Sequence, residues 1–417
     1  MWAITVDTSD HTLQTLYAGS PLGGIWKSVD QGNSWTNTGD QNNLSAISIS
    51  YITIDPANSQ HLLVATGVPW NNDPIGIGVV ESYDAGQTWT QTGLDNPAQQ
   101  SGINNRVKKV FLHPTDINKY FAFVKNQVII TLNQGVLWDS ILPINIPSHL
   151  ELEDLKFHPT NPDIIYCSTT GNAAKLYKTT NGGTTWSDIT SNFYNGTALV
   201  RHINIDIYPS QPDNLYVGLN DGSNFRFYKS TDSGQTSSEQ GNYSMSLHRG
   251  TPGGIKSIFM VNPTDDNYIL IGAVDYVRST DGGVSFNKLG NSALNEMHDD
   301  ARGSIWVHGA AFAANDGGIS ISTDNGATWY DRSDGLNIQQ HYGHDVDRNF
   351  TYLLTGLQDV GFYRYDIPQQ NWDHIHVPFS GDGGVPHISY GSGAAAIMNG
   401  FSGVGGIGDN ALYRSAS

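Results

Sequence analysis

The chain has 417 residues, a formal net charge of -18 and a single cysteine, Cys167. Its 46 glycines, 20 tyrosines and 10 tryptophans, with only 14% charged residues, are typical of an all-β protein with many short strands. The acidic balance and the lack of a Lys/Arg cluster exclude nucleic acid as the expected partner. One cysteine excludes an internal disulfide and a Cys-based metal site, and we expect it to be a buried thiol in a strand. No apolar run approaches the roughly 20 residues of a membrane span.

One short motif recurs along most of the chain. Its pattern is Ser/Thr-x-Asp/Asn-x-Gly-x-Ser/Thr-Trp, and seven copies, some degenerate, begin at residues 28, 82, 131, 179, 230, 279 and 322. A repeat of this length is the signature of a propeller or solenoid. In each copy the Asp or Asn bonds backbone amides of a tight turn, the Gly supplies a positive φ, and the aromatic packs back onto the sheet. The expected structural turn residues are Asp30, Asp84, Asn133, Asn181, Asp232, Asp281 and Asp324.

The segments around each motif predict four strands. A short alternating strand ends at a proline turn, an apolar strand and a loop follow, and the motif turn joins the third strand to the fourth. Four antiparallel strands joined in this way form one propeller blade. In chain order we expect blades near 2–40, 47–95, 105–143, 150–190, 201–240, 253–290, 303–335 and 341–377, and a partial blade at 385–417.

The predicted fold is therefore all-β, a multi-bladed propeller forming one domain over residues 1–417. Eight or more blades in one ring is the preferred arrangement, and two abutting propellers are the alternative. Residues 2–7 already read as a strand, so we expect a mature or trimmed chain. The last blade shows no fourth strand, which predicts that another segment completes it or that the sequence is truncated.

Function is expected in segments that interrupt the repeat, because loops on a rigid scaffold carry it. These segments are 69–74, 151–154, 243–254 and 297–302. An aromatic beside amides and a carboxylate is typical of sugar binding, and the best local match comprises Trp70, Asn71, Asn72 and Asp73. Trp70 as a simple loop anchor is the alternative. The remaining tryptophans are expected to pack in the core: Trp35, Trp89, Trp138, Trp186 and Trp329 at the motif, and Trp26 and Trp372 outside it.

No cofactor is expected, and metal sites are considered only at two places. His374 and His376 lie on the same face of one predicted strand, where imidazoles bind metals or, more commonly, hydrogen-bond the backbone. Asp299 and Asp300 have the oxygen ligands that calcium prefers, but a doubled carboxylate in a loop more often caps a turn.

The repeated motif resembles the Asp box, or BNR repeat, over nearly the whole chain. Among Asp-box families, sialidases are excluded by the absence of a Phe/Tyr-Arg-Ile-Pro motif. The chain looks most like the xyloglucan-active endoglucanase type and the sortilin-like type. Large secreted bacterial BNR-repeat proteins, often described as sortilin-like, share the sequences at 23–28, 356–361 and 381–384. This resemblance implies a secreted or cell-surface protein whose Asp boxes are structural.

The resemblance to xyloglucan hydrolases also implies where catalytic carboxylates would lie. Residues 17–26 are similar to the first blade of those enzymes, but Pro21 stands where they have a catalytic Asp and cannot transfer a proton. Asp359 matches the context of their second catalytic Asp. If the protein is a glycoside hydrolase acting through two carboxylates, Asp359 is one of the pair, and Asp299, Asp300 or Asp382 is the other.

We therefore expect a secreted or cell-surface propeller that acts as a non-catalytic binding or structural module. Its expected partner is a glycan or a cell-surface protein, and self-assembly remains a third class. A glycoside hydrolase acting on a β-glucan such as xyloglucan is the alternative function.

Overall fold

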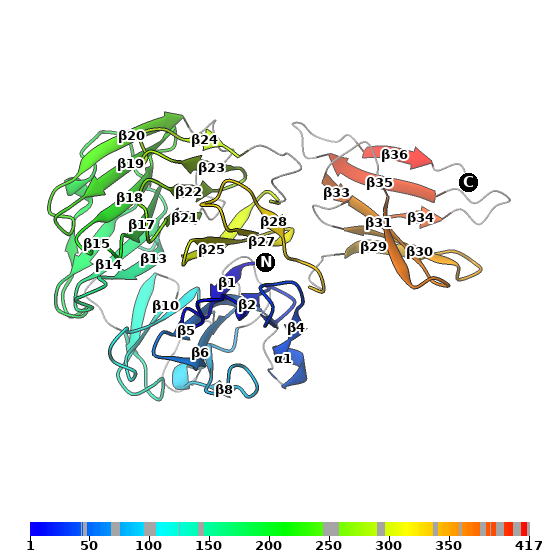
Figure 1. Cartoon of the computed structure of the whole chain (residues 1–417), viewed down its shortest axis with the longest axis horizontal. Coiled ribbons are helices and arrows are strands. Elements are labelled where there is room, and N and C mark those ends of the chain that lie inside the picture. The colour runs from blue at the N-terminus through cyan, green and yellow to red at the C-terminus, as the bar shows by residue number, and fades with distance from the viewer. Residues whose placement is uncertain are drawn as a thin grey trace. The chain divides into compact units, whose positions relative to one another are not determined.

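The computed structural model describes residues 1–42, 44, 48–67, 76–95, 106–124, 126–140, 146–244, 258–289, 297–336, 341–357, 361–375, 381–383, 385–388, 396–402 and 410–414. These residues divide into two compact units, unit 1 (Met1–Leu336) and unit 2 (Asn337–Ser417). Both are built almost entirely of β-strands, which confirms the predicted all-β propeller class (Figure 1). One domain over 1–417 stays a prediction.

The described residues of unit 1 form five four-stranded antiparallel sheets and one eight-stranded sheet over residues 151–244, which a pairing between Thr170 and His202 joins from two four-stranded halves. We count these halves as two sheets, which gives seven, each with its four strands paired in chain order. The first three sheets are β1 (Ala3–Val6), β2 (Leu16–Gly19), β3 (Ile25–Ser28), β4 (Thr36–Asn37); β5 (Ile49–Asp55), β6 (Asn58–Thr66), β7 (Val79–Ser82), β8 (Thr90–Gln91); and β9 (Lys109–Leu112), β10 (Tyr120–Val124), β11 (Gln127–Thr131), β12 (Asp139–Ser140). The next two are β13 (Glu151–Phe157), β14 (Ile165–Thr170), β15 (Leu176–Thr179), β16 (Ser187–Asp188); and β17 (His202–Ile207), β18 (Leu215–Asn220), β19 (Asn224–Ser230), β20 (Ser238–Ser244). The last two are β21 (Ile258–Val261), β22 (Ile269–Gly272), β23 (Tyr276–Ser279), β24 (Asn287–Lys288); and β25 (Ala301–Val307), β26 (Ala310–Asn315), β27 (Gly318–Ser322), β28 (Tyr330–Asp331). Short helices are α1 (Thr38–Gln41), η1 (Gly93–Asp95) and η2 (Thr190–Asn192).

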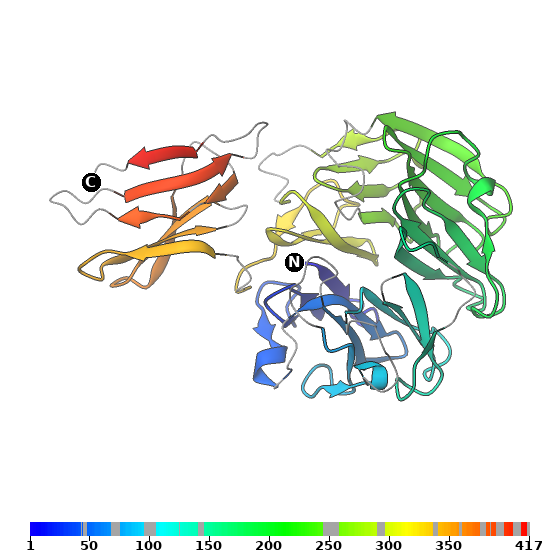
Figure 2. The same cartoon turned by 180° about the vertical axis from the view of Figure 1, so that it is seen from behind.

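The first and seventh sheets of unit 1 are neighbours. Strand β1 packs against both β5 and β25, so the succession of first strands returns on itself within unit 1 (Figure 2). A hydrogen bond of 2.7 Å from Trp35 Nε1 to the carbonyl of Arg332 also joins the two sheets. The seven sheets of unit 1 are therefore arranged as blades around one centre.

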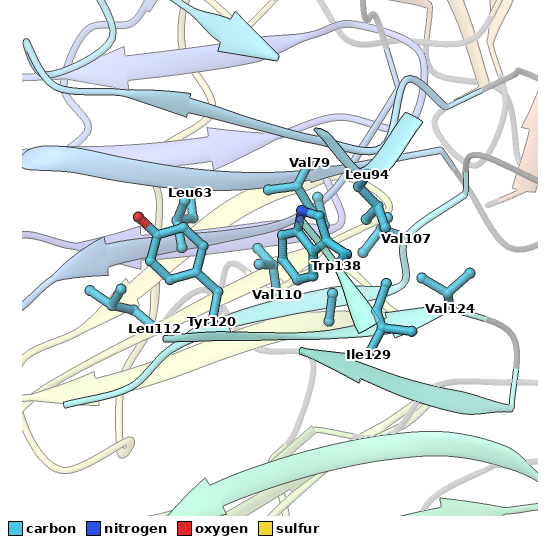
Figure 3. Close-up of a cluster of buried hydrophobic side chains, with 12 residues drawn as sticks. Leu63, Val79, Leu94, Val107, Val110, Leu112, Tyr120, Val124, Ile129 and Trp138 are labelled. Atoms are coloured by element: carbon cyan, nitrogen blue, oxygen red, sulfur yellow. The ribbon is translucent and has the colours of Figure 1, made fainter. Parts of the chain in front are cut away.

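The core lies between consecutive sheets. One cluster shows the pattern: Leu63 and Val79 from the second sheet interdigitate with Val110, Ile129 and other buried residues of the third (Figure 3). Each sheet of unit 1 has a neighbouring sheet on either side, so both of its faces are buried. Its strands therefore carry apolar side chains on both faces. Cys167 is fully buried in such a cluster, as predicted, and burial raises the pKa of its thiol.

Unit 2 contains two further sheets. One is β29 (His341–Val346), β30 (Tyr352–Leu357), β31 (Gly361–Asp366) and β32 (Asn371–Ile375), again in chain order. In the other, β35 (Ala396–Ser402) pairs with β33 (Gly381–Gly383), β34 (His387–Ile388) and β36 (Asn410–Arg414). The predicted blade at 341–377 thus matches β29 to β32.

The seven motif turns of unit 1 share one hydrogen-bond pattern. In the first, Asp30 Oδ1 accepts from the Ser28 hydroxyl at 2.7 Å and from the Ser34 amide at 2.9 Å, while the Gly32 amide donates to Ser28 Oγ at 2.8 Å. Equivalent bonds from Thr236 lower the pKa of Asp232 to about 2. The other acids and amides in this position are Asp84, Asn133, Asn181, Asp281 and Asp324. Each turn thereby satisfies its own backbone donors at an exposed site.

The glycine of each motif turn has a positive φ. At Gly283, a side chain would in addition clash with the ring of Phe227. The φ of Gly283 is +89°, and an added Cβ would lie 2.2 Å from the ring of Phe227 on the preceding blade. Gly309 has a similar φ of +84° but nothing within 4 Å of the same position.

We expect Gly283→Ala to destabilise the protein more than Gly309→Ala. Both substitutions carry the backbone cost of about 1–2 kcal/mol for a left-handed residue, and only Gly283→Ala adds a clash. Chemical denaturation of the two variants measures the difference, and equal losses would show that the ring of Phe227 moves aside freely.

Two expectations about local structure are wrong. Residues 151–154 form the start of strand β13 with a bulge between Leu152 and Asp154, so they are not an inserted loop. The side chains of Glu153 and Asp154 line a cavity, whereas Glu151 is exposed. Trp372 is 52% exposed, because it lies on the outer strand β32, where Tyr365 packs beside its ring.

Candidate functional site

Most of the predicted ligand and catalytic residues lie outside the part of the chain that the structure describes. Trp70, Asn71, Asn72, Asp73, Asp359 and His376 lie outside the described residues. His374 lies on β32 opposite Tyr363, and Asp382 lies on β33 opposite Phe401. Their proposed roles therefore stay predictions.

Asp299 and Asp300 are described, and they lie just before β25. The Asp300 amide donates to the carbonyl of Val274 at 3.1 Å, and its φ of 66° is one that Asp tolerates better than most residues. Partial burial and the nearby charge of Asp316 raise the pKa of the Asp300 carboxyl, although Arg302 opposes the shift. Arg302 binds Asp316 through Nε at 2.7 Å. Asp300 is therefore a partly buried acid that holds its proton more tightly than usual.

The described residues contain no group of three or more His, Cys, Asp or Glu side chains placed to hold a metal ion. His341, at the start of β29, hydrogen-bonds the Thr355 hydroxyl at 2.7 Å through Nδ1. Calcium binding by Asp299 and Asp300 stays untested. In the same described part, no helix is long and apolar enough to span a bilayer.

A central cavity of about 290 Å³ lies among the described blades of unit 1. Its lining includes residues from the first strand of all seven sheets: β1, β5, β9, β13, β17, β21 and β25. We call this cavity the channel. Because a first strand presents alternate side chains to the two sides of its sheet, the residues at the channel could not be separated from core residues by sequence pattern.

One wall of the channel carries a ladder of alternating charges on three consecutive blades. Lys109 Nζ lies 3.1 Å from Asp154 Oδ1, and Lys156 Nζ lies 3.7 Å from Asp154 Oδ2 and 3.3 Å from Asp206 Oδ1. Asp206 Oδ2 also accepts the Val261 amide at 2.8 Å, which extends the ladder to β21. We call Lys109, Asp154, Lys156 and Asp206 the charge ladder.

Electrostatics favour the charged form of the two lysines of the charge ladder. Burial lowers the pKa of Lys156, but the charges of Asp206 and Asp154 outweigh it and raise the pKa well above its usual range. The pKa of Lys109 is likewise raised, with burial opposed by Asp154 and Glu153. Neither lysine is therefore a neutral amine at physiological pH, so neither is prepared to act as a nucleophile.

Glu153 lies beside the ladder and is paired differently. Its Oε2 lies 2.9 Å from Lys108 Nζ, and both side chains are almost fully buried. Burial disfavours the carboxylate, but the charges of Lys108, His202 and Lys109 and the hydrogen bond from Lys108 together outweigh burial and hold the pKa of Glu153 far below its usual range. The segment 151–154, which contains Glu153 and Asp154, stood out in the sequence, but their partners Lys108, Lys109, Lys156 and Asp206 were missed. The only signal for these was a charged residue next to apolar strand positions.

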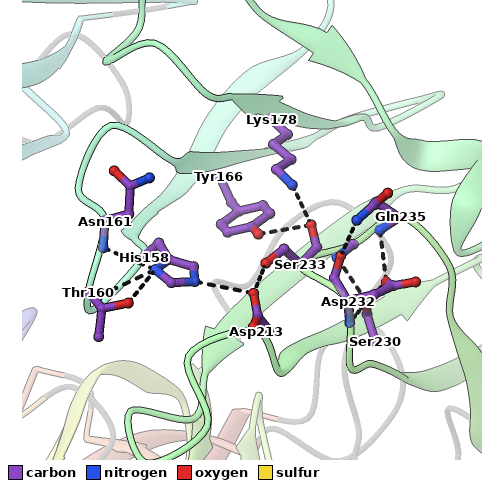
Figure 4. A network of polar contacts seen from close by, with 11 residues as sticks. His158, Thr160, Asn161, Tyr166, Lys178, Asp213, Ser230, Asp232, Ser233 and Gln235 are labelled. Atoms are coloured by element: carbon purple, nitrogen blue, oxygen red, sulfur yellow. Dashed lines mark hydrogen bonds and ion pairs between the residues drawn. The ribbon is translucent and has the colours of Figure 1, made fainter.

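The motif turns lie elsewhere and bind neighbouring blades to one another. The carbonyl of Ser233, in the turn of the fifth sheet, accepts from Tyr166 Oη at 2.9 Å and from Lys178 Nζ at 2.7 Å, both in the fourth sheet (Figure 4). The Ser233 hydroxyl donates to Asp213, which lies 3.6 Å from His158 Nε2. In the turn of the second sheet, the carbonyl of Ala85 likewise accepts from Tyr17 Oη and Lys27 Nζ, both in the first sheet. These turn contacts are part of the packing between blades.

A buried histidine, His61, lies between two carboxylates in the second sheet. Its Nδ1 lies 3.1 Å from Asp55 Oδ2 and its Nε2 lies 3.8 Å from Glu81 Oε2, while its ring stacks on Tyr83 at 4.4 Å. Burial lowers the pKa of His61, but the interactions with Glu81 and Asp55 outweigh it and raise the pKa above the usual value.

The stability contributed by His61 should therefore depend on pH. Because the pKa of His61 is higher in the folded than in the unfolded protein, protonation of His61 stabilises the fold. This stabilisation is complete below the unfolded pKa of about 6.5 and is lost as pH rises through the folded pKa. We expect the advantage of the native protein over His61→Gln to shrink between about pH 6 and pH 9. His113 is the control with opposite sign: burial and Lys119 lower its pKa, so the advantage over His113→Gln should grow as pH rises. Urea denaturation at several pH values checks both, and parallel pH trends would contradict the assignment.

Comparisons with known proteins agree with this fold. A family model described as sortilin, neurotensin receptor 3 matches residues 77–242. A search of curated proteins finds no match. Among solved structures, the GH74 xyloglucanase from Xanthomonas campestris is similar with a TM-score of 0.71 and 14% identity, covering 99% of this chain and 65% of that one. The chain thus spans less than two thirds of that enzyme.

Two further structures are similar over shorter or partial regions. YCF48 bound to D1 peptide has a TM-score of 0.53 and 13% identity, covering 77% of this chain and 91% of that one. The extracellular domain of a one component system from B. thetaiotaomicron has a TM-score of 0.52 and 12% identity, covering 96% of this chain and 50% of that one. At these identities the likeness concerns the fold alone. The findings confirm the predicted resemblance to a sortilin-like or xyloglucanase-like propeller.

Proposed function

We propose that the chain is a non-catalytic, extracellular binding module whose ligand is a glycan. The observation that carries this proposal is the state of the acids at the channel of unit 1. Asp154 and Asp206 are paired with lysines, and the pKa of Glu153 lies far below its usual range. General acid catalysis needs a carboxyl that holds a proton near the working pH. Glu153 is held as an anion, and Asp154 and Asp206 are each engaged by a lysine ammonium group.

The position of Pro21 supports the same proposal. Pro21 lies in the turn between β2 and β3, where the Ser20 amide donates to the carbonyl of Gly24 at 2.9 Å and Ser20 Oγ accepts the Gly23 amide at 3.0 Å. The resemblance to xyloglucan hydrolases assigns a catalytic carboxylate to this position, and proline has none. An extracellular location is supported by the similar extracellular domain of B. thetaiotaomicron.

The alternative is a glycoside hydrolase acting on a β-glucan such as xyloglucan. It is favoured by the raised pKa of Asp300, which is the property of a general acid. In this alternative Asp359 or Asp382 would supply the second carboxylate.

A paired assay separates the two functions. The first part measures new reducing ends released from xyloglucan, mixed-linkage glucan and other polysaccharides, with Asp300→Asn, Asp359→Ala and Asp382→Ala as variants. The second measures retention of the protein on the same glycans immobilised. We expect retention without turnover. Turnover that is lost in one of the variants would establish the hydrolase instead, and neither turnover nor retention would direct the search to protein partners and self-assembly.

A further inference from the structure

We propose that the channel of unit 1 binds one neutral sugar residue. This inference rests on the proposed function, since it names the part of a glycan that the channel takes and the residues that bind it. A cavity of about 290 Å³ lies at the lower end of the range of small-molecule sites, which is about 300–1,000 Å³. It therefore suits a ligand of about one ring.

The charge ladder supplies donors and acceptors side by side. The exposed fractions of the four side chains are 18% for Lys109, 19% for Asp154, 34% for Lys156 and 17% for Asp206, so each is partly accessible. An ammonium group has three donors and a carboxylate about four acceptor positions, which exceeds what the contacts within the ladder use. A ligand can therefore bond to the ladder without breaking its ion pairs.

Aromatic rings lie next to these polar groups. Tyr51 lines the channel, and Lys109 Nζ is 5.5 Å from the centre of its ring. Trp2 also lines the channel, and the Arg302 guanidinium lies 5.9 Å from its ring. The rest of the lining includes apolar side chains such as Ile52 and Met260. Aromatic surface beside hydrogen-bonding groups suits a ligand with both an apolar and a polar side.

The charges of the ladder decide the class of ligand. Its two lysines and two aspartates sum to zero, and so do Glu153 and Arg302, the other charged residues of the described lining. The channel therefore has no net charge to favour an anion or a cation. An apolar ligand would remove water from four ionised groups and replace none of its hydrogen bonds. A sugar hydroxyl accepts from a lysine and donates to an aspartate at the same time, and the C–H face of the ring packs on an aromatic. A neutral pyranose satisfies all of these constraints.

The experiment measures binding of methyl glycosides of glucose, xylose, galactose and mannose to the full chain by saturation-transfer NMR and calorimetry. Lys156→Met removes the central member of the ladder, and Ser304→Trp fills the channel from β25 without changing its charge. Lys175→Met is the matched control: it removes a lysine from the same sheet, but from the exposed pair Lys175–Asp188, outside the channel. Circular dichroism verifies that each variant is folded.

We expect at least one glycoside to bind, with affinity reduced at least tenfold by both Lys156→Met and Ser304→Trp and unchanged by Lys175→Met. Undiminished binding in both channel variants would overturn the inference, and so would displacement of the glycoside by inorganic phosphate at equal concentration. If no glycoside binds while the native protein is retained on an immobilised glycan, the inference fails and the proposed function stands. If neither free nor immobilised glycans bind, both fail.

Discussion

Replacing Glu153 with glutamine should lower the free energy of unfolding by about 3–5 kcal/mol, the usual cost of breaking a buried ion pair. The substitution keeps the size of the side chain and removes its charge. Lys108 is then left with a nearly buried ammonium group, whose remaining contacts are the Leu152 carbonyl at 2.7 Å and the exposed Glu151 at 3.8 Å. Because Lys108 and Glu153 connect the third and fourth sheets beside the channel, the loss weakens the contact between two blades. Chemical denaturation followed by circular dichroism measures the effect.

The control for Glu153→Gln is Asp188→Asn, which breaks the exposed pair Lys175–Asp188 at the same separation of 2.9 Å. Water already solvates that pair, so the expected loss is below about 1 kcal/mol. The double variant Lys108→Met/Glu153→Leu should recover most of the stability, since it removes both buried charges together. Similar losses in Glu153→Gln and Asp188→Asn would contradict the importance of burial.

Replacing Trp329 with alanine should cost about 3–5 kcal/mol, the range for truncating a buried tryptophan. Its side chain is 0% exposed and lies in the cluster that includes Ile258, Met260, Leu270 and Tyr276 of the preceding sheet. The indole Nε1 donates to the carbonyl of Gly326 at 3.1 Å, so the ring is fixed by the motif turn as well as by packing. The variant therefore leaves a large cavity between the sixth and seventh sheets.

Trp186 provides the matched comparison for Trp329→Ala. It occupies the same motif position in the fourth sheet and donates the same hydrogen bond, from Nε1 to the Gly183 carbonyl at 3.0 Å, but its ring is only half buried. Because the stabilisation scales with apolar area removed from water, Trp186→Ala should cost clearly less. Equal destabilisation by the two variants would mean that the shared hydrogen bond, not burial, sets the contribution of the motif aromatic.

The strands of the repeat were predictable because their signals are local. Motif turns such as 28–35 combine a glycine, a short polar side chain and an aromatic in fixed order, and alternating segments between them specify strands. The predicted order of four strands and a motif turn is therefore confirmed through β1 to β28. Local signals fail where burial depends on distant partners: Trp26 is buried as expected, whereas Trp372, on an outer strand, is exposed.

The channel could not be predicted for a related reason. Lys109, Asp154 and Asp206 are about fifty residues apart in sequence, and only the packing of three first strands brings their side chains within hydrogen-bonding distance. Residues 151–154 were expected to form an inserted loop that interrupts the repeat, whereas they begin strand β13. Burying a charged side chain costs free energy unless the charge is paired, and the sequence alone does not show which residues form the pairs.

By itself, the sequence determined the repeat, the four-strand unit, the glycine and Asp/Asn positions of the motif turns and the burial of most motif tryptophans, since all of these follow from short-range backbone preferences and amphipathic pattern. Only the tertiary structure decided that seven sheets of unit 1 surround one channel, that charged residues from three of them form a ladder, and that the carbonyls of Ala85 and Ser233 bind the preceding blade. Contacts between blades join residues far apart in the chain, and their energies depend on burial and distance, which are set only when the blades pack.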